Sequence, residues 1–203
     1  MAGGTGANAK GPGMSLTKAT LREQLRAEAA RHASAERQEG SLEICSRLDR
    51  EAIWRNARKV LAFMPLEGEP DITALFPPYL ASGRILALPR FDAAAGGYQA
   101  VHVTDPATQL VRGRYGVLEP KPECSLLSLK ELDLAVVPGI GFSLNGCRLG
   151  RGKGYFDRML CEVPGWKCGV AFDWQVTVEI PSEQHDIHVN SIVTPTRWHV
   201  TRA

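Results

Sequence analysis

The sequence has no apolar run near the length that a membrane span requires. A transmembrane helix needs roughly 20 mostly apolar residues, and polar residues interrupt every apolar segment of this chain before that length. Residues 1–13 are rich in glycine and alanine and have no apolar core segment, so they do not resemble a secretory signal. We expect residues 1–14 to form a disordered tail, with Met14 as an alternative start, and residues 15–203 to form a single domain.

Paired cysteine motifs are also missing. The five cysteines, at positions 45, 124, 147, 161 and 168, are an odd number and contain no Cys-x-x-Cys pair. This argues against a disulfide framework, and His185 and His188 have too few partners for a zinc site. We therefore expect reduced thiols and a cytoplasmic protein.

The net charge is small. A formal charge of +2 is too weak to attract a polyanion over the whole surface, so any basic patch must be local. The chain also lacks an aromatic and basic stripe, which disfavours an RNA-binding module. We expect small-molecule partners, no nucleic acid, no membrane, and a monomer.

The apolar pattern alternates between helical and strand-like periods. Helices are predicted from Ser15 or Thr17 to about Ala33, from Ser34 onward, over 71–80 and over 152–161, with Pro77 and Pro78 ending or bending the third. Strands are predicted at 59–66, 85–90, 98–103, 132–138, 169–172 and 191–196. This order predicts an α/β fold, a single-domain mixed sheet flanked by helices, with ligands beyond the carboxyl ends of its strands.

The segment 137–157 is the most informative part of the chain. It leaves an apolar strand and has glycines at 139, 141, 146, 150, 152 and 154, three cations (Arg148, Arg151 and Lys153) and a closing carboxylate, Asp157. Glycine lets a ligand approach the main chain, and backbone N–H groups with Arg and Lys favour phosphate oxygens. The segment, called the glycine run below, predicts a polyphosphate cradle with a metal ligand beside it.

Two common phosphate motifs do not fit the glycine run. A Walker loop needs a hydroxyl residue after Gly152-Lys153, where the chain has Gly154, and its earlier glycine would fall on Cys147. A dinucleotide fingerprint fails because Gly139 and Gly141 are not followed by a third glycine at the right spacing. A merely structural glycine turn with solvated cations stays open as an alternative.

The run Gly-x-Arg-Leu-Gly-Arg-Gly-Lys-Gly-Tyr-Phe-Asp, which ends at Asp157, resembles the signature of the 5-formyltetrahydrofolate cyclo-ligase family. The resemblance covers about residues 15–195. It includes further matches at 18–22, 63–69, 89–91, 116–120 and 183–186. It implies the α/β fold shared with ribose-5-phosphate isomerase and CoA transferases. The implied reaction converts 5-formyltetrahydrofolate and Mg-ATP into 5,10-methenyltetrahydrofolate, ADP and phosphate, through phosphorylation of the formyl oxygen.

The resemblance also implies roles for individual residues. Arg151 and Lys153 would be catalytic, and Asp157 and Asp186 would bind Mg²⁺. The implied ATP-binding residues are Lys18, Arg22, Arg148, Leu149, Gly150, Arg151, Gly152, Lys153, Gly154 and Tyr155. The implied substrate-binding residues are Met64, Glu69, Phe91, Tyr115, Gly150, Arg151, Gly152, Lys153, Gly154 and Tyr155.

Each role has a simpler structural alternative. Lys18 and Arg22 fit a solvated helix face, and Glu69 fits an ordinary loop charge. Phe91 fits the edge of the core, and Asp186 fits a surface carboxylate.

Three positions depart from the family pattern: Asn190 stands where Asp is usual, Phe156 where Tyr is frequent, and Cys147 where a polar residue is common. An asparagine at 190 would weaken any support of the metal, because it keeps an acceptor oxygen but loses the charge. A divergent paralogue that uses ATP on another small molecule therefore stays open. So do a sugar-phosphate isomerase or CoA transferase of the same fold, and a non-enzymatic nucleotide-binding module.

Overall fold

The computed structural model describes residues 17–113, 116–183 and 186–201, so the predicted tail, Tyr115 and His185 lie outside the described residues. The helices are α1 (Lys18–Ala29), α2 (Ser34–Arg50), α3 (Ala52–Asn56), α4 (Phe76–Ala81), α5 (Pro106–Gln109) and α6 (Tyr155–Leu160). The strands are β1 (Lys59–Leu61), β2 (Ile85–Asp92), β3 (Gly97–Val103), β4 (Leu110–Arg112), β5 (Leu118–Pro120), β6 (Leu134–Pro138), β7 (Gly141–Ser143), β8 (Arg148–Leu149), β9 (Trp166–Val170), β10 (Val176–Thr177), β11 (Ser191–Val193) and β12 (Trp198–Val200). No described helix is long and apolar enough to cross a membrane.

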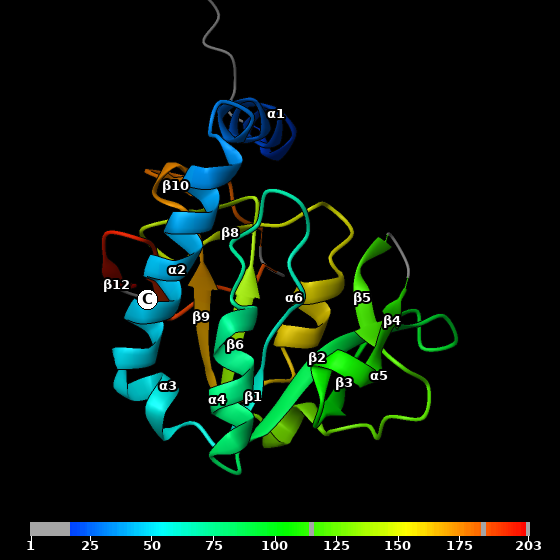
Figure 1. Ribbon diagram of the computed structural model, residues 1–203. Coiled ribbons are helices and arrows are strands. Elements are labelled where there is room, and N and C mark those ends of the chain that lie inside the picture. Colours follow the sequence, from blue (N-terminus) through cyan, green and yellow to red (C-terminus); the bar gives the residue numbers. More distant parts are fainter. Residues whose placement is uncertain (1–16, 114–115, 184–185, 202–203) are drawn as a thin grey trace, which may run out of the picture.

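The main sheet runs in the order β12-β11-β9-β6-β1-β2-β3 (Figure 1). Its inner strands are parallel, and β3 and β12 add an antiparallel pair at each edge. The strand β6 is buried along its whole length, as expected for a strand covered on both faces. The predicted mixed α/β sheet is confirmed.

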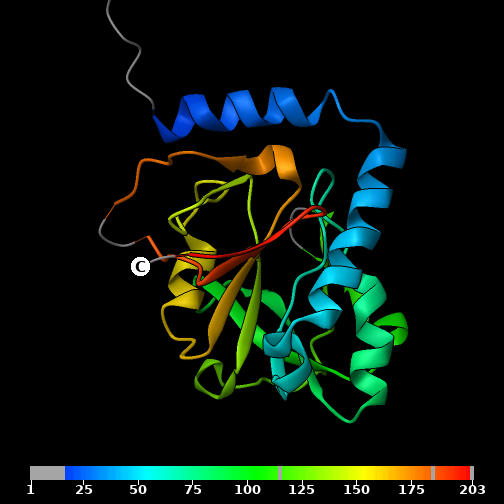
Figure 2. The ribbon, with the colours of Figure 1, turned by 90° about the vertical axis from the view of Figure 1, so that its left-hand side faces the viewer.

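Helices cover both faces of this sheet (Figure 2). On one face α2, α3 and α4 bury Leu48, Trp54 and Phe76 in the larger core. On the other face α6 buries Met159 and Leu160 in a second core. The two cores fix the positions of the strands, and the candidate site lies at the carboxyl ends of these strands.

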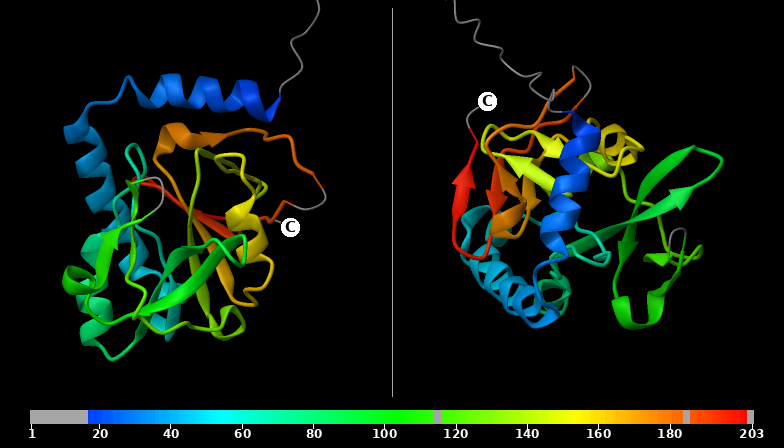
Figure 3. Two further views of the ribbon diagram at one scale, coloured as in Figure 1. Left: turned by 90° about the vertical axis from the view of Figure 1, so that its right-hand side faces the viewer. Right: turned by 90° about the horizontal axis from the view of Figure 1, so that it is seen from above.

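Helix α1 lies across the carboxyl end of the sheet, as seen in Figure 2 and, from above, in Figure 3. Its amino end is closed by a capping box between Thr17 and Thr20. Leu21 and Leu25 are buried against Cys147, Leu149 and Ile180 in a third, smaller core. The same helix therefore presents its first turn to the glycine run. Figure 3 also shows β4 and β5 beside β3, at the opposite edge of the sheet from β12.

The glycine run begins with a hairpin that the sequence pattern did not predict. After β6 the chain forms β7 and β8, which join β10 in a small second sheet. The fully buried ring of Phe142 in β7 lies against Gly139 and Gly169, where an added Cβ would come within 2.8 Å and 2.6 Å of it. These two glycines let the hairpin pack closely on the main sheet.

Several predicted boundaries were wrong. The first helix ends at Ala29 rather than Ala33, and the strand predicted over 59–66 ends at Leu61. Pro77 and Pro78 do not end their helix; they lie in the first turn of α4, where a missing N–H costs nothing. Helix α6 begins at Tyr155, not at 152, because Gly152 and Gly154 have φ angles of 98° and 63° that a helix cannot use.

We expect Gly169→Ala to lower the free energy of unfolding by about 1–3 kcal/mol, because its methyl group would overlap the enclosed Phe142 ring. Gly97→Ala is the matched control, since a Cβ there meets no atom within 4 Å and its φ is not left-handed. Urea denaturation of the two variants and the parent measures the difference. Equal stability of the two variants would contradict this account of the hairpin.

Candidate active site

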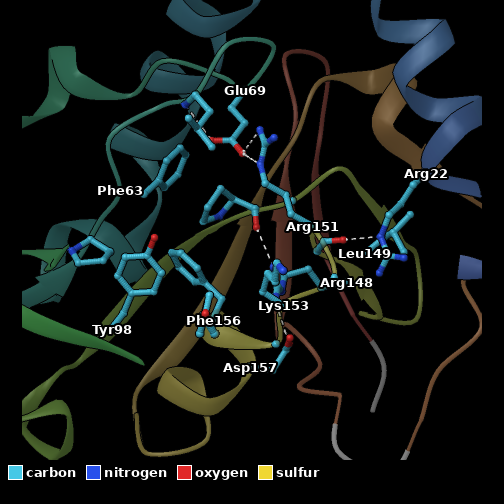
Figure 4. Close-up of a pocket in the computed structure, with 18 of the residues that line it drawn as sticks. Arg22, Phe63, Glu69, Tyr98, Arg148, Leu149, Arg151, Lys153, Phe156 and Asp157 are labelled. Carbon is cyan, nitrogen blue, oxygen red and sulfur yellow. Dashed lines mark hydrogen bonds and ion pairs between the residues drawn. The ribbon is translucent and has the colours of Figure 1, made fainter. Parts of the chain in front are cut away.

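One pocket of about 800 Å³ lies beyond the carboxyl ends of β1 and β6, under the first turn of α1. Segments that are distant in sequence line it: α1, the chain after β1, parts of β2, β3 and β5, the glycine run and the segment before β11. Every described residue predicted for the site lines this pocket except Phe91. Figure 4 shows Phe63 and Tyr98 on one side of the pocket and Arg22 on the other.

Arg148 is the most buried cation of the site, with its side chain 5% exposed. Its guanidinium donates to the Pro138 carbonyl at the end of β6 (3.3 Å) and to Asp157 Oδ1 in α6 (2.8 Å). It also lies 5.7 Å from the centre of the Phe156 ring. Arg148 therefore ties β6, β8 and α6 together. Some of its N–H donors are used within the protein and are not available to a phosphate.

Arg22 fixes the position of α1 over the glycine run. Its Nε donates to the Gly150 carbonyl at 2.8 Å. A Cβ added to Gly152 would lie 3.6 Å from the Arg22 guanidinium, so that group lies over the loop. Arg22 and the loop main chain thus face the pocket together.

Arg151 bridges to the segment after β1. Its Nη2 and Nε lie 3.0 Å and 3.3 Å from Glu69 Oε1, while Glu69 Oε2 accepts from the Leu66 N–H. The Arg151 side chain is 48% exposed, but that of Glu69 is only 10% exposed. The sequence analysis expected both residues to bind the substrate and Arg151 also to bind ATP, and the structure joins the two side chains by an ion pair.

Lys153 differs from the other cations of the glycine run. Its side chain is exposed, and its ammonium group has no hydrogen bond or ion pair with another described residue. It lies between two glycines in left-handed conformations, Gly152 and Gly154. Lys153 is therefore a positive charge on the pocket wall. Because no described residue pairs with it, its ammonium group is available to a ligand.

Lys18 closes the pocket from α1. Its Nζ lies 2.6 Å from Asp186 Oδ2 and 3.5 Å from Glu183 Oε1. Burial alone lowers the pKa of Lys18, but the hydrogen bond and charge of Asp186, with a smaller effect of Glu183, outweigh it and raise this pKa. Lys18 is therefore charged at every pH below the ordinary lysine pKa, and on the alkaline side its charge is lost only as pH rises past the raised value.

Aromatic rings form the wall opposite α1. Tyr98 and Tyr155 meet edge to face with centroids 5.7 Å apart, and Phe156 lies 6.2 Å from Tyr98. Phe91, predicted to touch the substrate, lies outside the lining and packs behind both tyrosines at 5.5 Å and 5.4 Å. Tyr98, which is half-buried, is therefore a ring that lines the pocket, and Phe91 packs against it.

The carboxylates predicted to bind metal both line the pocket. Asp157 uses Oδ1 for Arg148, and its Oδ2 has no hydrogen bond to any described residue. Asp186 Oδ2 accepts from Lys18 and from the Glu183 N–H. No group of three or more metal-ligating side chains lies together in the described chain. One available carboxylate oxygen suits a Mg²⁺ ion that keeps waters and phosphate oxygens as its other ligands.

Sequence reasoning missed Tyr98, Phe63, Glu119 and Glu183, which also line the pocket. Phe63, Glu119 and Glu183 fall in segments that matched the family, so that match could have drawn attention to them. Nothing in the sequence indicated a role for Tyr98 in the site; it was predicted only to begin a strand.

Asn190, expected to weaken support of a metal, lies outside the lining of the pocket. Its Oδ1 instead accepts from the Lys167 N–H at 2.8 Å, so it joins β9 to the start of β11. The expected link between Asn190 and the metal therefore has no support in this structure.

Comparisons with known proteins agree on one family. The sequence profile of the 5-formyltetrahydrofolate cyclo-ligase family matches residues 14–195. The chain is similar to the 5-formyltetrahydrofolate cyclo-ligases of Mus musculus (28% identity, covering 87% of this chain and 90% of that protein) and Mycolicibacterium smegmatis (33%, 70% and 76%). It also resembles the NMR structure of Aquifex aeolicus 5,10-methenyltetrahydrofolate synthetase, with a TM-score of 0.83 and 33% identity over 93% of this chain and 94% of the other.

A further solved structure supports the fold alone. The 5,10-methenyltetrahydrofolate synthetase from Mycoplasma pneumoniae has a TM-score of 0.72 at 17% identity, and covers 89% of this chain and 99% of that one.

The contacts predict that two neighbouring cations differ in their effect on stability. Arg148→Met should lower the free energy of unfolding by about 2–4 kcal/mol, because it leaves Asp157 without its buried partner. Lys153→Met should change it by less than about 0.5 kcal/mol, since the ammonium group has no partner in the described chain. Chemical denaturation measures both, and a loss of similar size in the two variants would refute the distinction.

Proposed function

The chain belongs to the 5-formyltetrahydrofolate cyclo-ligase family, and we propose that it catalyses the ATP-dependent cyclisation of 5-formyltetrahydrofolate to 5,10-methenyltetrahydrofolate, with release of ADP and phosphate. The observation that carries the proposal is that one pocket combines an aromatic wall with a glycine loop whose Lys153 has no partner among the described residues. The first feature suits a polyphosphate, and the second suits a flat heterocycle.

The nucleotide half of the site is formed by the glycine run and α1. Lys153 and the main chain of Gly152 and Gly154 are suited to hold phosphate oxygens, and Arg22 and Lys18 approach the same loop from the helix. Phosphoryl transfer depends mainly on positioning and on neutralising charge. We assign the catalytic neutralisation to Lys153 and Arg151, and we assign Arg148 chiefly to positioning the loop.

The folate half is formed by the segment after β1 and the aromatic wall. Phe63, Met64 and Tyr98 offer apolar surface for a pterin ring. Glu69 holds Arg151, and because a carboxylate has about four acceptor positions, it can also accept from the pterin N–H groups. The Arg151–Glu69 ion pair would thus fix the position of the folate relative to ATP.

The chemistry follows in two steps. The formyl oxygen attacks the γ-phosphorus, an O–P bond forms, and the bond to ADP breaks with its electron pair on the departing oxygen. The neighbouring folate nitrogen then attacks the activated formyl carbon, loses its proton and closes the ring as phosphate leaves with the C–O electron pair. The proposed task of the protein is to align these atoms and to neutralise the charge on the transferred group.

Mg²⁺ fits the donor set as an ion carried by the nucleotide. Asp157 would supply one carboxylate ligand through its Oδ2, and Asp186, which is held by Lys18 in this structure, stays a predicted second ligand. When bound, the ion would neutralise charge on the phosphate oxygens.

The direct test is optical. Purified protein mixed with 5-formyltetrahydrofolate and Mg-ATP should produce the near-ultraviolet absorbance band of the methenyl product. Lys153→Ala should lower kcat/KM by about 10²- to 10³-fold, because it removes a charge at the transferred phosphate. Absence of the band with the parent protein, despite measurable ATP binding, would favour action on another small molecule.

Lys130→Ala is the matched control, because Lys130 is also exposed and lies outside the pocket. It should keep parent activity. If Lys153→Ala lost melting temperature in proportion to its lost turnover, the glycine run would be a structural turn rather than a phosphate cradle.

Lys18 provides a second test. Lys18→Met should raise the KM for ATP by about tenfold, because it removes a charge-assisted contact from the helix that covers the nucleotide. Initial rates at varied ATP concentration measure the effect, with Lys130→Met as the control. An unchanged KM for ATP would exclude Lys18 from the nucleotide site.

A further inference from the structure

Three planar rings stack at the carboxyl end of α1, and none of them lines the candidate active site. The fully buried Phe172 ring lies nearly parallel to the Trp174 ring, with centroids 4.5 Å apart and an interplanar angle of 15°. Trp174 in turn stacks on the His32 ring, with centroids 3.6 Å apart and an angle of 10°. His32 lies in the connection between α1 and α2 (Figure 2), so the stack runs from the core of the sheet to the end of α1.

Polar contacts hold both the ring and the main chain of His32. Its Nδ1 lies 2.8 Å from Glu36 Oε1 in α2, and its Nε2 lies 3.7 Å from Glu28 Oε1 in α1. Arg37 donates to the His32 carbonyl from α2. The His32 side chain is only 20% exposed, although it belongs to a short connection between two helices. These contacts suit His32 to fix the direction of α1 relative to α2.

Helix α1 depends on contacts at its ends, because Leu21 and Leu25 are its only buried residues. Leu25 fits against Gly141, where an added Cβ would lie 2.5 Å from Leu25 Cδ1. The amino end of the helix carries Lys18 and Arg22, which line the pocket. A helix is stiff along its axis, so a rotation about Leu25 that lifts the carboxyl end also shifts Lys18 and Arg22.

We propose that His32 is a positioning residue for the nucleotide: by stacking on Trp174 it fixes α1 at the angle that places Lys18 and Arg22 over the glycine run. The inference rests on the proposed function, since it takes ATP as the ligand of that run. Stacked rings contribute free energy beyond the burial of their surface, so the loss of one ring loosens the helix end. His32 lies outside the pocket and acts only through the helix, so its loss should alter nucleotide affinity rather than the chemical step.

The test compares nucleotide binding with turnover. His32→Ala should weaken the binding of Mg-ATP, measured by calorimetric titration without folate, by about threefold to tenfold. The KM for ATP should rise in parallel, while kcat at saturating ATP and the KM for 5-formyltetrahydrofolate stay within about twofold of the parent values. Without any ligand, amide hydrogen exchange over residues 18–29 should be faster in this variant than in the parent protein.

Further variants separate the ring stack from a general loss of stability. His32→Phe keeps a flat ring on Trp174 and should restore ATP affinity to within about twofold of the parent. Trp174→Ala should weaken ATP binding at least as much as His32→Ala, and the double variant should be no weaker than Trp174→Ala, because both changes remove the same contact. His102→Ala changes a half-buried histidine of β3 outside the pocket and should bind ATP as the parent does.

Three outcomes would overturn the role of His32: unchanged ATP affinity in His32→Ala, a loss that His32→Phe does not restore, or the same loss in His102→Ala. A parent protein that binds no ATP would overturn it as well. Failure of the proposed reaction gives a different result. ATP affinity that depends on the stack, but without the methenyl band, would contradict the reaction and keep the role of His32.

Discussion

The buried guanidinium of Arg148 is the contact on which the rest of the site depends. It reaches from β8 to the last carbonyl of β6 and to the first turn of α6. The glycine loop between β8 and α6 has no regular hydrogen-bonded structure of its own, so its ends must be held by something else. With only 5% of the side chain exposed, water competes weakly for these bonds, so they are suited to hold the ends of the loop in place.

Five cations share the site, and four of them are held by contacts within the protein. Lys18 forms an ion pair with Asp186. Arg148 and Arg22 hold main-chain carbonyls, and Arg151 holds Glu69 across the pocket. Only Lys153 has no partner among the described residues, so it is the cation whose charge can act on a ligand at least cost. Contacts of this kind hold a loop in position, which would reduce the entropy lost when a ligand binds.

Much of this arrangement could be predicted from particular residues. The spacing of the glycine run and its cations indicated the phosphate cradle, and the flanking segments indicated the family. The family and the mixed α/β sheet are confirmed. The individual roles at the site stay predictions. The hairpin β7–β8 was missed because its strands are too short to show a periodic apolar pattern. The start of α6 was predicted too early because the pattern of apolar residues does not show which glycines have left-handed backbone angles.

The sequence by itself determined which chemistry the chain can support, because glycine, cations and carboxylates at that spacing suit few ligands other than phosphates. Only the tertiary structure decided which of these groups is available. A sequence cannot show that Arg148 is enclosed, that Arg151 is held by Glu69, or that Tyr98 rather than Phe91 lines the pocket. Each of these facts depends on segments distant in the chain meeting at the carboxyl end of one sheet, and packing alone sets such meetings.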